Sequence, residues 1–221
     1  KVCELCFNVL KYLKRGVNLK TINPNNLNQK DNYKLLSASV VPRPIAFVTT
    51  LNDDNSLNGA PFSFFTVLTA KPPLIMLSIL RKDGGVMKDT ARNILRNKEY
   101  VVHLTTMDNI EKINLTAALL DVNVSEVDLA KLTKVKSELI KTPGVKEAKI
   151  RFEVTLDKHI ELGDEDEITA DLLIGRVKLY HLHSDIYQNS YINFENLRPI
   201  GRLAGNDFLT KDGFKEIIRP K

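Results

Sequence analysis

The chain has 221 residues, of which 43% are hydrophobic and 27% charged, so it suits one large or two small globular domains and not a disordered protein. The formal net charge is +5, but the basic residues are spread along the chain, which argues against a nucleic-acid partner. No apolar run approaches the roughly 20 residues of a membrane span, so we expect no membrane partner and a cytoplasmic location.

The N-terminal segment, residues 1–18, begins without Met and carries Cys3 and Cys6 in KVCELCF. A single C-x-x-C without a second pair or a nearby His is weak evidence for zinc, so two incidental thiols in a reducing cytosol are favoured. No small-residue cleavage site of a secretory signal follows. We expect residues 1–18 to be an extension or an added segment outside the fold, and residues 19–221 to form a single domain.

The first part of the domain reads as a series of strands. INPNNLNQKDN (22–32) is polar and turn-rich and is expected to be a connecting segment. In VVPRPIAFVTTL (40–51) the run from Ile45 to Thr50 predicts a strand, NDDNSLNG (52–59) a hairpin turn, and residues 60–68 a returning strand. The continuous apolar run 72–80 predicts a strand buried on both faces.

Helices are predicted between the strands in the middle of the chain. RKDGG (81–85) reads as a loop, and KDTARNILRN (88–97) as a helix with Asp89 or Thr90 as its N-cap. EYVVHLTT (99–106) reads as a strand, and residues 108–120 and 125–132 read as helical.

The clearest alternation lies in RFEVTLDKHIEL (151–162). Its period of two predicts a strand with Arg151 and Glu153 on a wet face and an apolar opposite face. That opposite face comprises Phe152, Val154, Leu156, Ile160 and Leu162. Residues 168–183 repeat the pattern, with Gly175 as an expected bulge. Strands joined by short turns, with helices inserted, predict a mainly β fold built as an antiparallel barrel.

The sequence lacks the common motifs for catalytic, nucleotide-binding and metal-binding residues. The four histidines are His103, His159, His181 and His183, and no H-E-x-x-H, G-x-S-x-G, P-loop or strand-linked G-x-G-x-x-G motif occurs. His181 and His183 fall on one side of a strand but lack a specific third ligand, so we expect no metal site. A hydrolase triad is likewise unsupported.

An anion site is predicted where residues 78–94 lead into a helix. Arg81 and Lys82 follow a strand, two glycines then allow the backbone N–H groups to turn inward, and a helix begins near Lys88. A helix N-terminus favours a phosphate through its unpaired N–H groups. The residues expected to strengthen this site are Lys88, Asp89, Thr90, Arg92 and Asn93. The same segment is equally compatible with an ordinary capped helix whose charges are solvated.

The stretch NGAPFSFFTV (58–67) predicts a surface for a flat ring. Gly59 and Ala60 are small enough to let a ring approach the backbone, whose polar groups would read the ring edge. The hydroxyls of Ser63, Thr49 and Thr50 are expected to add polar contacts. Apolar packing against the ring is expected from Phe62, Phe64 and Phe65. The alternative is that one or two of these phenylalanines are plain core. A phosphate site beside a ring surface indicates a nucleotide-like cofactor.

Three segments resemble the flavin reductase-like family with the FMN-binding split barrel. They are residues 40–79, which include R-P-I-A and N-G-A-P-F-S-F-F; KDTARNI (88–94); and LRPIGRLAGNDF (197–208). The resemblance extends from about residue 33 to about residue 218 and leaves out the N-terminal 18 residues. The family often has Tyr at the end of the last motif, where this chain has Phe208, so no phenolic hydroxyl is expected there.

The resemblance implies non-covalently bound FMN, a six-stranded Greek-key-like barrel, and a homodimer with the flavin near the subunit interface. It places Asn58, Ala60, Ser63, Phe64 and Phe65 along the isoalloxazine and ribityl, and Arg81, Lys88, Thr90 and Asn93 near the phosphate. Arg43, Thr49, Thr50, Ser78 and Asp89 complete the expected set of cofactor-binding residues.

The function expected from the resemblance is hydride transfer from NAD(P)H to the flavin, by an enzyme that supplies reduced flavin to a partner oxygenase. The cofactor carries the difficult chemistry, so no catalytic acid is needed, which agrees with the missing catalytic sets. His183 and Arg202 are the candidate NAD(P)H contacts. Either NADH or NADPH is compatible, and so is FMN as prosthetic group or as substrate. The alternatives are an FMN-binding electron carrier without NAD(P)H activity and a basic nucleic-acid-binding barrel.

Overall fold

The computed structural model describes residues 19–117 and 125–210, so Cys3 and Cys6 lie outside the described residues. The chain divides into two compact units, Lys1–Ser39 and Val40–Lys221. The first unit contains the short 3-10 helix η1 (Pro24–Asn26) and helix α2 (Gln29–Ser39), so part of the expected connecting segment is helical. The side chain of Asn23 starts η1 by accepting a hydrogen bond from the Asn25 N–H. The single domain expected over residues 19–221 stays a prediction.

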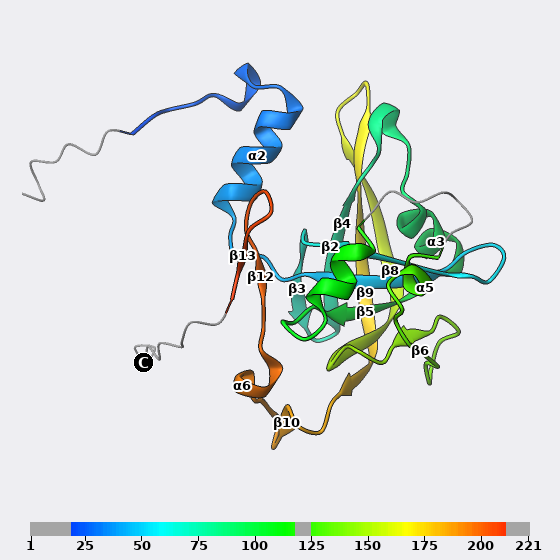
Figure 1. Ribbon diagram of the computed structural model, residues 1–221. Coiled ribbons are helices and arrows are strands. Elements are labelled where there is room, and N and C mark those ends of the chain that lie inside the picture. Colours follow the sequence, from blue (N-terminus) through cyan, green and yellow to red (C-terminus); the bar gives the residue numbers. More distant parts are fainter. Residues whose placement is uncertain (1–18, 118–124, 211–221) are drawn as a thin grey trace, which may run out of the picture. The chain divides into compact units, whose positions relative to one another are not determined.

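The second unit is built on one seven-stranded sheet with the order β2-β1-β5-β8-β9-β4-β3 (Figure 1). Every neighbouring pair in it is antiparallel. Its strands are β1 (Ala46–Leu51), β2 (Leu57–Phe62), β3 (Phe65–Ala70), β4 (Pro73–Leu80), β5 (Glu99–Leu104), β8 (Ile150–Gly163) and β9 (Ile168–Leu182). The mainly β split barrel with inserted helices is therefore confirmed, with seven strands in its sheet where six were expected.

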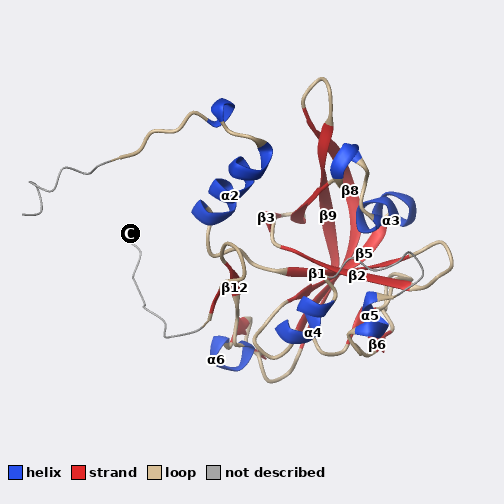
Figure 2. Ribbon diagram, turned by 45° about the horizontal axis from the view of Figure 1, so that its top comes forward, coloured by secondary structure: helices blue, strands red, loops and turns tan. Residues whose placement is uncertain are grey.

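Short helices and strand pairs fill the connections (Figure 2). The helical elements are η2 (Asp83–Gly85), α3 (Asp89–Asn97), α4 (Ile110–Leu115), α5 (Glu126–Leu129) and α6 (Phe194–Leu197). The small pairs are β6 (Lys134–Val135) with β7 (Gly144–Val145), β10 (Tyr187–Gln188) with β11 (Tyr191–Ile192), and β12 (Gly201–Arg202) with β13 (Phe208–Leu209). None of the helices in the described ranges is both long and apolar enough to cross a bilayer.

The predicted strand over residues 60–68 is wrong, because the chain breaks at Ser63 and Phe64 into two strands. β2 pairs with β1 at one end of the sheet order, and β3 pairs with β4 at the other end. The predicted two-sided burial of residues 72–80 is also wrong. Ile75, Leu77 and Ile79 are buried, and the residues between them are half-buried, so β4 has one core face.

The β8–β9 hairpin departs from simple alternation because it contains bulges. The register places Asp157 of β8 and both Thr169 and Lys178 of β9 as the extra residues, so Gly175 is not itself the bulge. Beyond the first of these, Ile160 and Leu162 are exposed, contrary to the predicted apolar face. Glu153, predicted to face water, is fully buried. Its carboxylate accepts hydrogen bonds from His181 and from two backbone N–H groups.

Apolar clusters cover both faces of the β1–β2 hairpin. One cluster joins Val48 to Ala91 and Ile94 of α3, and Phe62 packs against it. The other joins Phe47 and Leu57 to the helices α4 and α5. Because side chains alternate along β2, Asn58, Ala60 and Phe62 face the α3 side, and Leu57, Gly59 and Pro61 face the other side.

Candidate functional site

A buried hydrogen-bond network joins the β1–β2 hairpin to α3. The Thr50 hydroxyl accepts hydrogen bonds from the Nδ2 groups of Asn58 (3.0 Å) and Asn93 (3.1 Å). Asn58 Nδ2 also donates to Thr90 Oγ1 (3.0 Å), and Asn93 Nδ2 donates to Asn52 Oδ1 (2.7 Å). Thr50, Asn58, Thr90 and Asn93 are all buried, so four of the predicted site residues meet at one place and fix α3 against β2.

The N-terminus of α3 lacks a side-chain cap. The helix begins at Asp89, with Lys88 in the extended N-cap position, so the prediction of Asp89 or Thr90 as N-cap is wrong. A lysine side chain has only donors and cannot accept from the first-turn N–H groups. The Thr90 hydroxyl is directed instead to Asn58. The first turn of α3 therefore has no N-cap acceptor from its own cap residue.

Lys88 is a half-buried cation at this helix end. Burial, and then the neighbouring charge of Lys82, lower the pKa of Lys88. Within residues 19–117 and 125–210 its ammonium makes no ion pair. Lys82 differs, because it is more exposed and its Nζ lies 3.8 Å from Asp89 Oδ2. Asp89 also pairs with Arg92 on the helix surface. Lys88 is thus the cation at this end that an incoming anion would neutralise.

Arg81 is held by carboxylates of the β8–β9 hairpin. Its guanidinium bonds both oxygens of Asp171, at 3.0 and 2.8 Å, and Glu161 at 2.6 Å. Hydrogen bonding to Asp171 is the main cause that raises the pKa of Arg81. Burial opposes ionisation of Asp171, but hydrogen bonds from Arg81 and His159 outweigh it and lower the pKa of that carboxyl. Arg81 therefore anchors the loop at η2, and its placement near a phosphate stays a prediction.

Arg43 is buried and connects the first sequence motif to the last. Its guanidinium donates to Ser63 Oγ (3.3 Å), to the Val40 carbonyl (2.7 Å) and to the Leu203 carbonyl (2.8 Å). It also lies 5.9 Å from the centre of the Phe64 ring. The backbones of Arg43 and Arg202 pair in both directions. Arg43 thus holds Ser63, Phe64 and the C-terminal motif in one place.

Three further predicted residues have structural partners. Thr49 is fully buried, and its hydroxyl donates to the Pro143 carbonyl at 2.8 Å. Phe65 belongs to the barrel core. The Ser78 backbone N–H donates to the Phe64 carbonyl at 2.9 Å, which joins β4 to the break between β2 and β3.

The space beside Gly59 is filled by protein, contrary to the expectation that it would admit a flat ring. A Cβ on Gly59 would lie 2.7 Å from Phe47 Cζ and 2.8 Å from Val127 Cγ2. Ala60, which faces the α3 side, is partly exposed. A ring that approaches β2 on the side of Asn58 and α3 would therefore meet Ala60 and not Gly59.

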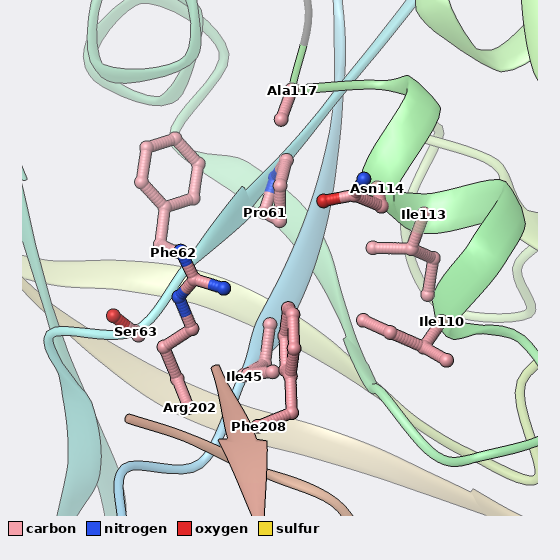
Figure 3. A pocket seen from close by; sticks show the side chains of 10 residues that line it. All are labelled: Ile45, Pro61, Phe62, Ser63, Ile110, Ile113, Asn114, Ala117, Arg202 and Phe208. Carbon is pink, nitrogen blue, oxygen red and sulfur yellow. The ribbon is translucent and has the colours of Figure 1, made fainter. Parts of the chain in front are cut away.

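A cavity of about 180 Å³ lies where β2 ends (Figure 3). Pro61, Phe62 and Ser63 line one side, and α4 lines another. Arg202 and Phe208, from the last sequence motif, complete it. The Arg202 guanidinium lies 4.4 Å from the centre of the Phe208 ring. His183, the second predicted NAD(P)H contact, does not line this cavity and pairs with Asp185.

Sequence reasoning did not identify the polar residues that α4 and α5 bring to the site. Asn114 of α4 lines the cavity, together with Ile110 and Ile113. Glu126 of α5 accepts a hydrogen bond from the Gly59 N–H at 3.4 Å, and burial raises the pKa of its carboxyl. The apolar spacing in residues 108–120 predicted a buried face, but it carried no signal for the partner of that face. Clusters of three or more His, Cys, Asp and Glu suited to a metal are not found in the described part of the chain.

Comparison with known proteins gives one family and close structural matches. The model of the flavin reductase like domain matches residues 38–200. An uncharacterized protein of Bacillus subtilis (strain 168), YwrF, is 46% identical over 89% of this chain and 97% of its own length. The crystal structure of nitrilotriacetate monooxygenase component B from Bacillus cereus is 48% identical, with a TM-score of 0.87 over 90% of this chain and 98% of that one. The 2-nitrobenzoate 2-nitroreductase NbaA of Pseudomonas fluorescens is 25% identical, with a TM-score of 0.82 over 91% of this chain and 96% of that one.

Proposed function

The chain belongs to the flavin reductase like domain family, and from this premise we propose that it binds FMN without a covalent bond and reduces it with NAD(P)H. The family membership itself supports a flavin-related oxidoreductase. The finer proposal depends on whether this chain offers a site for the phosphate of a mononucleotide and for the flavin ring beside it.

The phosphate site is supported by the N-terminus of α3, and this is the observation that carries the proposal. Lys88 stands half-buried at the N-cap position with a lowered pKa and no ion pair among the described residues. The first-turn N–H groups lack an acceptor from that cap residue. A phosphate monoester would supply both the acceptor oxygens and the negative charge that this arrangement needs.

The ring site is supported by the strand that leads away from that helix. Asn58 is tied to Thr90 of α3, and Ala60 follows on the same face of β2. Ser63 lies at the end of the strand, oriented by Arg43. We infer that the ribityl chain extends from α3 past Asn58, and that the ring lies along Ala60 towards Ser63 and Phe64.

When bound, FMN supplies the hydride-accepting ring nitrogen and the electrons that pass on to an acceptor. The chain's own residues bind and orient the cofactor. Lys88 neutralises the phosphate, and the buried network around Asn58 holds α3 at a fixed distance from β2. Hydride transfer between two oriented rings needs positioning and no acid or base, so the absence of a catalytic triad from the sequence fits the proposal.

We further propose that the protein works as a homodimer, as the family resemblance implies, and delivers reduced flavin to a partner oxygenase. The similarity to the Bacillus cereus protein, which is component B of nitrilotriacetate monooxygenase, supports an oxygenase partner for this chain. The cytoplasmic location stays a prediction.

The proposal is tested by mixing the purified protein with FMN under anaerobic conditions and adding NADH or NADPH. We expect FMN to bind and its visible absorption band to bleach with at least one of the two nucleotides, faster than in a protein-free control. If FMN binds but neither nucleotide bleaches it, the chain is an FMN-binding electron carrier and the enzymatic part is wrong. If the folded protein binds no flavin, the whole proposal is wrong.

A further inference from the structure

We propose that the cavity at the end of β2 is a binding site for a planar organic anion with one ring, of the aromatic carboxylate class. The role of this ligand as an electron acceptor beside the flavin rests on the proposed function. The binding of the ligand in the cavity does not. The cavity is separate from the α3 N-terminus, and of the predicted cofactor residues it contains only Ser63.

The size of the cavity limits its ligand to one ring. Its volume is about 180 Å³, whereas sites for drug-sized ligands enclose about 300–1,000 Å³. A pyridine dinucleotide is too large for it, so a contact between Arg202 and NAD(P)H would have to form outside. Most of its wall is apolar and comes from Ile45, Pro61, Phe62, Ile110 and Ile113, which suits the faces of an aromatic ring.

Arg202 gives the cavity its charge preference. Its Nη2 donates to the Gly205 carbonyl, and the guanidinium stacks on Phe208. Across the described ranges it has no carboxylate partner, unlike Arg81, Arg176 and Arg198. Figure 3 shows the guanidinium reaching between Phe62 and Phe208. A fixed cation without an anion at an apolar cavity selects a carboxylate over a neutral amide.

Two neutral polar groups complete the site. The Ser63 hydroxyl accepts from Arg43 Nε, which leaves its own proton for donation. The Asn114 carboxamide lies across the cavity from Arg202 (Figure 3). A carboxylate held by Arg202 would present its second oxygen to one of these donors, so the ring would be fixed in orientation as well as position.

The test compares benzoate with its neutral isostere benzamide, by calorimetry or ligand-observed NMR on the full chain. Wild type is expected to bind benzoate at least about tenfold more tightly than benzamide. Arg202→Gln should remove that preference, and Arg176→Gln, which alters a half-buried arginine on β9 that is paired with Asp157, should keep it. Equal binding of the two ligands by wild type, or unchanged benzoate binding in Arg202→Gln, overturns the proposal.

A second variant covers the case in which Arg202→Gln disturbs the β12–β13 pair. Asn114→Leu removes an exposed amide on α4 and leaves that pair intact, and it should weaken benzoate binding roughly threefold to tenfold. Unchanged benzoate binding in this folded variant, or no benzoate binding by wild type, would refute the site. FMN affinity is measured on the same samples. If wild type binds benzoate but no FMN, the proposed function is contradicted and this inference stands.

Discussion

At the residue scale, Tyr100 of β5 is unusual because its polar hydroxyl is buried. It is fully buried in the barrel core, and its hydroxyl has no hydrogen-bond partner in the described residues. Burial raises the pKa of Tyr100, so the phenol stays protonated. Gly175 makes room for it, because a Cβ at that position would lie 2.0 Å from the Tyr100 hydroxyl and 2.5 Å from Val154 Cγ1.

We predict that Tyr100→Phe leaves the free energy of unfolding unchanged or raises it by about 1 kcal/mol, because it removes an unsatisfied buried hydroxyl. Gly175→Ala should lower it by about 2 kcal/mol or more through overpacking. In the double variant part of that loss should be recovered. Urea unfolding of the four proteins measures all three effects. A loss above about 1 kcal/mol in Tyr100→Phe would show that the hydroxyl has a partner after all.

Also at this scale, the sequence predicted residue types at the site better than residue partners. Thr50, Asn58, Thr90 and Asn93 were all among the expected cofactor residues, and they do meet. The pairing of Arg81 with Asp171 and Glu161 was not foreseeable. It depends on the register of two strands whose carboxylates are 80 and 90 positions further along the chain.

At the element scale, the His103 side chain of β5 forms hydrogen bonds with the backbones of two other strands, β1 and β7. Its Nδ1–H donates to the Phe47 carbonyl of β1, and its Nε2 accepts from the Val145 N–H of β7, both at 2.9 Å. This pattern requires the neutral ring. Burial lowers the pKa of His103 to about 3.

Stability should therefore fall as the pH falls below about 6.5, where the unfolded histidine takes up a proton and the folded one does not. The expected contribution is about 1.4 kcal/mol per pH unit between roughly pH 6 and pH 4. It is measured as the difference in urea-unfolding free energy between wild type and His103→Gln at each pH, because other groups titrate in both proteins. Parallel pH curves for the two proteins would rule this role out.

Helix α3 and the long hairpin were predictable as elements because their patterns span many residues, and the predicted helical stretches 108–120 and 125–132 contain the short α4 and α5, whereas α2 and α6 were not predicted. The break between β2 and β3 was not, since a two-residue interruption inside an apolar stretch leaves the pattern intact. The same holds for the N-cap of α3. Asp89 and Thr90 are good capping residues, but the Thr90 hydroxyl accepts a hydrogen bond from Asn58, and the helix starts two residues earlier than a Thr90 cap would allow.

At the scale of the whole molecule, sequence motifs that are far apart meet around the end of β2. Arg43 and Arg202 pair through their backbones, and Ser63 and Phe208 line the same cavity. The proposed phosphate site at α3 is linked to the same strand through the hydrogen bond between Asn58 and Thr90. One strand thus connects the two proposed ligand sites.

The central claim is that α3 binds the phosphate of FMN, and it is tested most directly by comparing FMN with riboflavin, which lacks the phosphate. Fluorescence titration of wild type should show tighter binding of FMN. Lys88→Met should weaken FMN about 10- to 100-fold and leave riboflavin nearly unchanged, as expected for loss of a charge-assisted contact. The matched variant Lys82→Met, at a more exposed lysine, should lose far less. Equal affinities of wild type for FMN and riboflavin, or an equal loss for both ligands in Lys88→Met, would contradict the account.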